Sequence, residues 1–292
     1  MKQSPHIKVM TLYPLIVLLL LLCMPVSAAV VDEFHDAAVI ETSKITAMSD
    51  LVEAINAHRI VFVGETHPSV EDHMLQMHVL ETMAAQGRPL AIGVEWFQKP
   101  FQHVLDRYID GSIDERELLR DTEYYQRWGF DYRIYRPMMR YARKAGIRVL
   151  ALNIEREVTD NMMRSGIDGL TENQQKKLPA EYDFSETAYT RLLRNMFGMP
   201  GSSFGHGTDE EFQRFLQVQI TWDEVMAETA ATYLKENPDT RMVLFVGRGH
   251  MHSGAIPQRL RRRMDMPTLT LLNYSPDTSF NDADYLVLGQ EE

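Results

Sequence analysis

Cysteine is almost absent from the sequence. The chain has 292 residues and a single cysteine, Cys23, which lies at the end of an apolar run near the N-terminus. If the residues before Ala29 are removed as a leader, the mature chain has no cysteine. Disulfide bonds, thiolate zinc sites and cysteine nucleophiles are then all excluded.

Basic residues are scarce relative to acidic ones. There are 30 lysines and arginines against 41 aspartates and glutamates, which gives a formal net charge of −11. Nucleic-acid binding depends largely on contacts from Lys and Arg to phosphate, so this balance argues against a nucleic-acid partner. Hydrophobic residues make up 45% of the chain, which is enough for one large globular domain with a sizeable core.

The first residues have the pattern of a secretory signal peptide. A weakly basic start leads into an unbroken apolar core at residues 15–24, and a small residue, Ala28, follows where cleavage would fall. We therefore expect residues 1–28 to be a signal peptide. Residues 29–292 are expected to form one α/β domain, exported to the periplasm.

Two forms of membrane attachment compete with this interpretation. The apolar stretch is almost long enough to span a bilayer, so an uncleaved N-terminal anchor is one alternative. The other is lipidation, because Cys23 lies where bacterial lipoproteins carry their lipidated cysteine. Leu22 disfavours lipidation, since lipoprotein processing prefers a small residue before the cysteine.

Short runs of β-branched and aliphatic residues alternate with segments of helical apolar spacing. These runs are residues 60–64, 90–95, 148–153, 242–247, 268–273 and, as a sixth candidate, 284–289. Alternating strands and helices predict an α/β fold with a mostly parallel central sheet flanked by helices. The long interval between the third and fourth strands predicts a large helical insertion at residues 155–240.

Polar side chains follow four of the predicted strands. They are Glu65 with His67, then Glu95, Asn153 and His250. The carboxyl ends of parallel strands meet at one end of a sheet, where ligands of open α/β folds bind. We therefore expect these side chains to converge in one crevice, with Gly64 and Gly247 turning the chain sharply at two of the strand ends.

Asp223 and Arg248 are two further candidates for the catalytic crevice. Asp223 falls on the apolar stripe of a predicted helix, and a carboxylate on a buried stripe needs a partner. Arg248 lies in the second of two Gly-x-x-His sequences. There it could hold the carboxylate of Glu65 or Glu95, or an acidic group of a ligand.

Two chemistries suit such a cluster of carboxylates and imidazoles. In the first, a divalent metal ion supports hydrolysis of a peptide or an ester, and its candidate ligands are Glu65, His67, Glu95 and His250. In the second, the same groups act as acid and base without a metal, if burial separates their pKa values. For any one of these residues taken alone, a helix cap or a local ion pair is the alternative.

Five stretches of the sequence together resemble a known family. They are "VFVGETH", "GVEWF", "RYARKAGIRVLALN", "QVQITWDEVMAET" and "VGRGHMHSGAIPQRL", in matching order from about residue 51 to residue 267. In these stretches the chain is similar to the ChaN-like haem-binding uptake proteins of the Tiki and erythromycin-esterase-like superfamily. The resemblance implies haem binding for iron uptake. It also implies two candidate partners, which are outer-membrane uptake machinery and a second copy of the chain in a homodimer.

The resemblance also directs attention to residues that could hold haem. Haem binding needs an axial ligand, an apolar slot and cations for two propionates. The candidates for these roles are Tyr182, Tyr189, His206 and Arg136. The leading hypothesis is an exported haem-binding protein. A metal-dependent hydrolase is the alternative, and a partner-binding protein with a vestigial site is the third.

Overall fold

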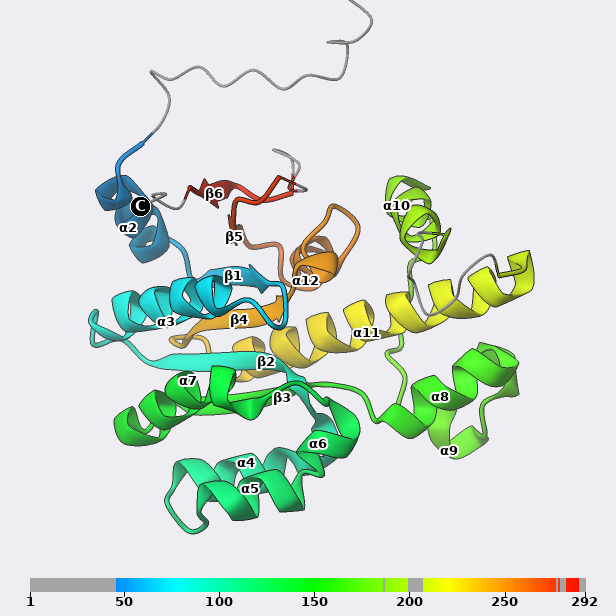
Figure 1. Ribbon diagram of the computed structural model, residues 1–292, viewed down its shortest axis with the longest axis horizontal. Coiled ribbons are helices and arrows are strands. Elements are labelled where there is room, and N and C mark those ends of the chain that lie inside the picture. Colours follow the sequence, from blue (N-terminus) through cyan, green and yellow to red (C-terminus); the bar gives the residue numbers. More distant parts are fainter. Residues whose placement is uncertain (1–45, 186, 199–206, 277, 279–281, 289–292) are drawn as a thin grey trace, which may run out of the picture. The chain divides into compact units, whose positions relative to one another are not determined.

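Six parallel strands form the central sheet of the protein (Figure 1). They are β1 (Ile60–Glu65), β2 (Leu90–Gln98), β3 (Arg148–Asn153), β4 (Arg241–Gly247), β5 (Thr268–Asn273) and β6 (Tyr285–Val287). Along the sheet they lie in the order β3, β2, β4, β1, β5, β6, and all neighbouring pairs are parallel. The predicted α/β fold with a parallel sheet is therefore confirmed. The computed structural model describes residues 46–185, 187–198, 207–276, 278 and 282–288.

The two strands that end in Gly-x-x-His sequences are neighbours in the sheet. β1 pairs with β4 from Ile60 opposite Met242 to Glu65 opposite Gly247. All residues of both strands are buried, as expected for a parallel sheet whose two faces are covered by helices. The register therefore brings the turns after β1 and β4 side by side at one end of the sheet.

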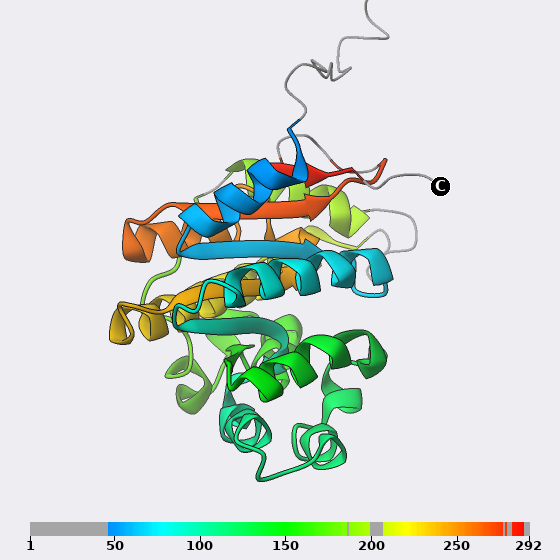
Figure 2. The same cartoon turned by 90° about the vertical axis from the view of Figure 1, so that its left-hand side faces the viewer.

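Helices cover both faces of the sheet (Figures 1 and 2). The first hydrophobic core includes residues from α2 (Met48–Ala57), α3 (Val70–Ala84), α4 (Gln102–Ile109), α5 (Glu115–Asp121), α6 (Tyr124–Arg127) and α7 (Tyr132–Ala145). The second core includes residues from α11 (Asp209–Glu236) and α12 (Ile256–Met264). Burial of apolar surface on both faces is the main force that holds the layers together.

A large helical insertion separates β3 from β4, as predicted. It contains α8 (Arg156–Ser165), α9 (Glu172–Gln175), α10 (Thr187–Gly198) and the long helix α11. α11 begins after Thr208, whose side chain accepts a hydrogen bond from the N–H group of Glu211. Glu211 in turn accepts a hydrogen bond from the N–H group of Thr208. This reciprocal cap satisfies two backbone donors at the start of the helix.

Short 3-10 helices complete the described part of the chain. They are η2 (Lys99–Phe101), η3 (Ile167–Gly169) and η4 (Arg248–His250). η4 follows β4 directly and presents the second Gly-x-x-His sequence at the strand end.

The outer edge of β3 is covered by one side chain. The amide of Gln102 donates a hydrogen bond of 2.8 Å to the carbonyl group of Val149 and accepts one of 2.8 Å from the N–H group of Ala151. Unpaired edge strands offer these groups to other chains. Gln102 therefore occupies backbone groups that a further strand would otherwise use.

The predicted leader cannot be followed in the structure. Residues 1–28 and Cys23 lie outside the described residues, so cleavage and lipidation remain predictions. Among the helices of the described part, none combines the length and the apolar character needed to cross a membrane.

Candidate functional site

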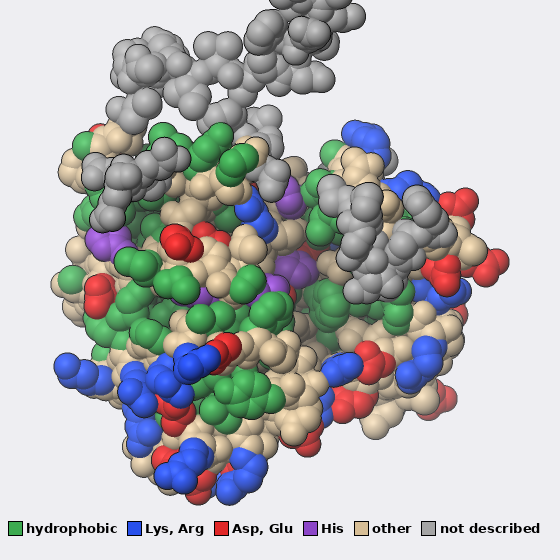
Figure 3. Space-filling model, in the orientation of Figure 1, with side chains coloured by type: hydrophobic (Ala, Val, Ile, Leu, Met, Phe, Trp, Pro, Cys, Tyr) green, Lys and Arg blue, Asp and Glu red, His purple; other side chains and the backbone are tan. Residues whose placement is uncertain are grey.

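Acidic and imidazole side chains gather at the carboxyl ends of the strands, and histidine side chains are visible near the centre of the face shown in Figure 3. Glu65 ends β1, Glu95 lies in β2, and His250 lies in η4 directly after β4. His67 follows β1 and lies close enough to Glu95 and His250 for their charges to act on it. The structure therefore brings together four of the five residues that the sequence predicts to converge.

Glu95 is held by the backbone of the neighbouring strand. Its Oε2 atom accepts a hydrogen bond of 2.6 Å from the N–H group of Gly247. Its Oε1 atom lies 3.4 Å from Nε2 of His250. The side chain is buried, so these two partners replace the water that would otherwise solvate the carboxylate.

Asp223 binds the other ring nitrogen of His250. Its Oδ1 atom accepts a hydrogen bond of 2.6 Å from Nδ1 of His250, and its Oδ2 atom accepts one of 2.6 Å from the hydroxyl group of Tyr189. Asp223 is fully buried in α11. The carboxylate that the sequence places on an apolar stripe therefore has two partners, and it ties α11 and α10 to the strand end.

The charges of this group stabilise one another. Burial by itself disfavours the charged form of His250, but the carboxylates of Glu95 and Asp223 outweigh it and raise the pKa of His250 to about 10. Burial likewise opposes the charge on Glu95, yet the imidazolium of His250 lowers the pKa of Glu95 to about 2. At neutral pH, His250 is therefore a buried cation between two carboxylates.

Glu65 is the centre of a second buried network. It is 1% exposed, and its Oε1 atom accepts hydrogen bonds of 2.9 Å from Nδ1 of His67 and from the hydroxyl group of Tyr135. Its Oε2 atom accepts a hydrogen bond of 2.7 Å from the side-chain amide of Gln76. Trp128 extends the network, because its indole N–H group donates to the Tyr135 hydroxyl at 3.1 Å.

His67 is the more accessible of the two imidazoles. Its side chain is 27% exposed, and its ring packs against Trp128 and Phe130, each with a centroid distance of 4.7 Å. Burial opposes its charge, but the hydrogen bond to Glu65 and the nearby carboxylate of Glu95 prevail and raise the pKa of His67. Glu65 fixes Nδ1 of the ring, so Nε2 is the atom left for proton transfer.

Gly247 makes room for this imidazole. A Cβ atom at Gly247 would lie 2.8 Å from Cε1 of His67 and 3.3 Å from Oε2 of Glu95. The backbone of Gly247 has a φ of −58°, which any residue can adopt. Glycine is therefore needed here for space and not for backbone conformation.

Two arginines lie elsewhere than the sequence suggests. Arg248 contacts neither Glu65 nor Glu95, because its guanidinium donates hydrogen bonds to the hydroxyl groups of Ser275 and Thr278 in the segment after β5. Arg136 does not reach the crevice. It forms an ion pair of 2.7 Å with Glu115 of α5.

Asn153 has a structural contact at the predicted place. Its side-chain amide donates a hydrogen bond of 3.3 Å to the backbone carbonyl group of Glu95, and its Oδ1 atom accepts one of 2.9 Å from the N–H group of Ile154. The residue joins the ends of β2 and β3. It therefore shapes the crevice but does not touch either imidazole through these bonds.

The haem-ligand candidates in the insertion differ in availability. The hydroxyl group of Tyr189 is buried and bound to Asp223, so it belongs to the strand-end site. The hydroxyl group of Tyr182 donates a hydrogen bond of 3.3 Å to Thr221, and burial raises the pKa of Tyr182 to about 12. His206 lies outside the described residues. Neither described tyrosine presents a free oxygen to a ligand.

Metal ligation finds no support in this arrangement. Among the residues that the structure describes, no group of three or more His, Cys, Asp or Glu side chains is placed as metal ligands would be. The carboxylates of Glu65 and Glu95 are instead engaged by hydrogen-bond donors of the protein. The structure therefore does not support the predicted metal site of Glu65, His67, Glu95 and His250.

Sequence reasoning missed the residues that hold Glu65. Gln76 lies 11 positions after Glu65, on the next helix, and Tyr135 lies 70 positions after it, so both contacts with Glu65 depend on how α3 and α7 pack on the sheet. One signal was present. Tyr135 shares an apolar stripe of α7 with Met138, Met139 and Ala142, and a buried tyrosine hydroxyl needs a hydrogen-bond partner.

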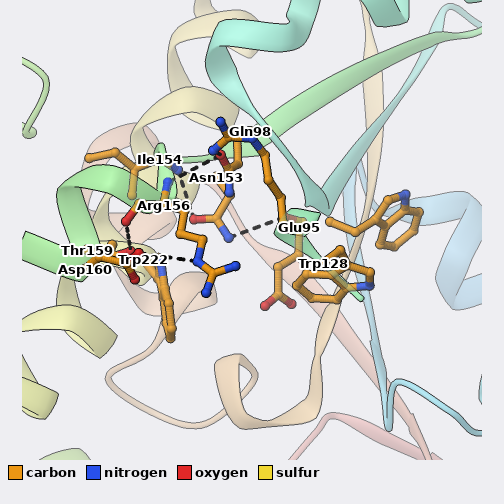
Figure 4. A pocket seen from close by; sticks show the side chains of 11 residues that line it. Glu95, Gln98, Trp128, Asn153, Ile154, Arg156, Thr159, Asp160 and Trp222 are labelled. Carbon is orange, nitrogen blue, oxygen red and sulfur yellow. Dashed lines mark hydrogen bonds and ion pairs between the residues drawn. The ribbon is translucent and has the colours of Figure 1, made fainter. Parts of the chain in front are cut away.

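A cavity of about 260 Å³ opens beside Glu95, between the ends of β2 and β3 and helices α6, α8 and α11 (Figure 4). The chain has three tryptophans, and all three line this cavity: Trp96, Trp128 and Trp222. Trp128 packs against His67, and the indole of Trp222 meets the ring of His250 edge-on at a centroid distance of 6.2 Å. The cavity therefore adjoins both imidazoles of the site.

Comparison with known sequences identifies one family. A family model described as haem-binding uptake, Tiki superfamily, ChaN matches residues 51–260. A chloroplastic protein of Arabidopsis thaliana, Protein RETICULATA-RELATED 5, is 23% identical over 239 residues. That match covers 76% of this chain and 32% of the plant protein, so the chain spans about a third of the length of that relative.

Solved structures of other proteins were found that resemble this chain in fold. A structure described as cofacial haem binding to ChaN of Campylobacter jejuni matches with a TM-score of 0.68 and 14% sequence identity. The match covers 84% of this chain and 92% of that one. A structure of the erythromycin esterase EreC in its open conformation matches with a TM-score of 0.47 and 14% identity, over 77% of this chain and 72% of that one. The first match supports the same α/β fold for both chains.

Proposed function

The chain belongs to the ChaN family of haem-binding uptake proteins in the Tiki superfamily. We propose that it binds haem as part of iron uptake. The observation that carries this proposal is the extent of the family match. It spans residues 51–260 and so includes most of the sheet and all the residues of the strand-end site. The signal-peptide pattern of residues 1–28 supports a place of action outside the cytoplasm.

Haem would bind on the surface of this chain and not inside the described cavity. Pockets that bury drug-sized ligands measure roughly 300–1,000 Å³. A porphyrin with two propionates is a large ligand on that scale, and the cavity beside Glu95 measures about 260 Å³. A surface position would require an exposed axial ligand, and neither Tyr182 nor Tyr189 presents one.

Tyr125 fits the role of axial ligand better than the predicted tyrosines. It lies in α6, is 55% exposed, and its hydroxyl group makes no hydrogen bond to the described residues. A tyrosine oxygen is an established ligand of haem iron. The exposed guanidinium of Arg133 is close enough for Tyr125 to contribute, after Asp131, to raising the pKa of Arg133. This cation would receive a propionate.

A haemin titration of residues 29–292, followed by the visible absorption spectrum, tests the proposal. A saturable shift of the Soret band at one haem per chain would support haem binding. A linear, non-saturating increase in absorbance, equal to that of an unrelated acidic protein, would contradict it.

A second candidate function is hydrolysis of an ester or amide by the strand-end site. The observation that favours it is the accessible imidazole of His67, which is oriented by the buried carboxylate of Glu65. In such a pair Nε2 of the imidazole takes a proton from an attacking water, and the carboxylate stabilises the imidazolium that forms. The buried cation of His250 nearby can offset negative charge that develops on the substrate oxygen.

Hydrolysis of an activated ester such as p-nitrophenyl acetate tests the second function. General-base catalysis contributes about 10²–10⁴-fold, so the H67A variant should lose activity to that extent if His67 is the base. His78 is exposed on α3, and H78A is the matched control. Equal activity of both variants and the unaltered protein would exclude His67 as the base.

A further inference from the structure

The cavity beside Glu95 has features of a binding site that haem does not use. Trp222 on α11 and Trp128 after α6 stand on opposite sides of it, with Arg156 and Glu95 between them (Figure 4). Indole faces stack well on flat apolar groups. The walls therefore suit a ligand with a planar body that fits between two rings.

Arg156 is a cation with hydrogen-bond donors that no described residue accepts. It is 54% exposed at the start of α8, its Nε atom lies 3.4 Å from Asp160, and one terminal nitrogen donates a hydrogen bond of 2.6 Å to the carbonyl group of Gln126. The other terminal nitrogen has no partner among the described residues. In Figure 4 the guanidinium is directed into the space between Trp222 and Glu95.

The neighbouring arginine serves as a contrast. Arg127 is 15% exposed and donates to both carboxylate oxygens of Glu157, at 2.9 and 3.0 Å. It also contacts Glu123 and Gln98. Arg127 is therefore engaged by protein acceptors, and Arg156 is the cation of this cavity that can accept a new anion.

The carboxylate of Glu95 does not oppose an anion here. Glu95 is already paired with the imidazolium of His250 and with the N–H group of Gly247, so most of its charge is compensated. A guanidinium binds a carboxylate through two parallel hydrogen bonds. A carboxylate on Arg156 would leave the rest of a small ligand beside the two imidazoles.

We propose that this cavity binds a small planar carboxylate, with its flat body between Trp128 and Trp222 and its carboxylate on Arg156. The site is independent of haem, because its volume is too small for a porphyrin. It would serve the second candidate function as a substrate pocket, but the binding itself does not require hydrolysis.

Tryptophan fluorescence tests this proposal directly, because all three tryptophans line the cavity. Haem-free protein, residues 29–292, is titrated with phenylacetate and, as the uncharged match, with phenylacetamide. A charge-assisted contact should make phenylacetate bind on the order of 10-fold more tightly. The R156Q variant should lose this preference, while its affinity for phenylacetamide stays within about 3-fold, which shows that the pocket is intact.

Two further variants sharpen the result. R156K keeps the charge but loses the planar fork, so its preference for phenylacetate should be intermediate. Arg120 is exposed on α5, and among the described residues its only ion-pair partner is Asp121, so R120Q is the matched control and should behave like the unaltered protein. Equal affinity for both ligands, an unchanged preference in R156Q, or no saturable response to either ligand would overturn the proposal. None of these outcomes bears on the haemin titration.

Discussion

Asp223 Oδ1 lies 2.6 Å from Nδ1 of His250, although the two residues are 27 positions apart in the sequence. The contact joins the middle of α11 to the end of β4. It fixes the orientation of the imidazole and directs the opposite ring nitrogen toward Glu95. The helical insertion and the sheet are thereby connected through one buried ion pair.

The first prediction concerns the pH dependence of stability. The pKa of His250 is raised to about 10 in the folded protein, above the usual value of about 6.5. The stabilisation by the protonated ring is therefore complete below about pH 6.5 and is lost as the pH rises toward 10. We expect the free energy of unfolding, measured in urea, to decline over this range.

The D223N variant tests the origin of this decline. Removing one partner of a buried ion pair costs roughly 3–5 kcal/mol, so D223N should be markedly less stable at pH 6 and should lose less stability between pH 7 and 10. D239N changes an exposed aspartate and is the control. A parallel decline in D223N and the unaltered protein would assign the pH dependence to other groups.

The second prediction compares two buried tyrosines of neighbouring helices. The hydroxyl group of Tyr135 donates to Glu65 and accepts from Trp128, whereas that of Tyr124 is buried without a partner among the described residues. Hydrogen bonds to charged groups contribute about 1.5–3 kcal/mol, so Y135F should destabilise the protein by that amount. Y124F removes an unsatisfied polar group and should be neutral or stabilising. Similar losses of stability in both variants would argue against the Glu65 network.

The third prediction concerns space beside His67. In G247A the new methyl group would lie 2.8 Å from Cε1 of His67, so the imidazole must move. Such overpacking typically costs 1–3 kcal/mol, roughly. In G249A the nearest side-chain atom to the new methyl group is Cε of Met196, at 3.7 Å, which is an ordinary contact. Imidazole NMR signals should therefore shift in G247A and stay in place in G249A.

The fourth prediction concerns the haem ligand. If the oxygen of Tyr125 binds the iron, Y125F should weaken haemin binding by at least about 10-fold and change the visible spectrum. Tyr274 is also exposed, and Y274F is the control with the same chemical change. Retention of the spectrum and affinity in Y125F would remove Tyr125 as the ligand and leave surface binding through another residue to be sought.

The fifth prediction concerns the pH dependence of ester hydrolysis. A general base must be unprotonated, and the pKa of His67 is raised above its usual value. The rate should therefore increase with pH and reach a plateau only above about 6.5, the ordinary pKa of histidine. A rate that falls as the pH rises through neutrality would mean that His67 acts as an acid.

Much of the architecture could be predicted from the sequence because its signals are local. The strands are mostly apolar runs of three to nine residues, and all six predicted strands are present, with ends shifted by a few residues. The convergence of Glu65, Glu95 and His250 follows from one rule, since the carboxyl ends of parallel strands lie together. Asp223 could be placed near a partner because its helix stripe is otherwise apolar.

The rest depends on contacts that no local pattern encodes. Arg248 turns toward Ser275 and Thr278, and Arg136 turns toward Glu115, because hydroxyl and carboxylate acceptors from other segments lie closer. Tyr189 shares an acceptor with His250 instead of facing solvent. Long cationic and tyrosine side chains can reach acceptors in several directions, so their targets require the packed structure.

The side chain of Gln102 limits how copies of the protein can associate. Its amide makes the hydrogen bonds that the backbone of an added strand would make. The β3 side of the sheet therefore has fewer free backbone donors and acceptors for a second chain. Continuous sheets across two subunits are therefore disfavoured on this side. A second copy that approached the β3 side would therefore meet the side chain of Gln102 at Val149 and Ala151, where it would otherwise find free backbone groups.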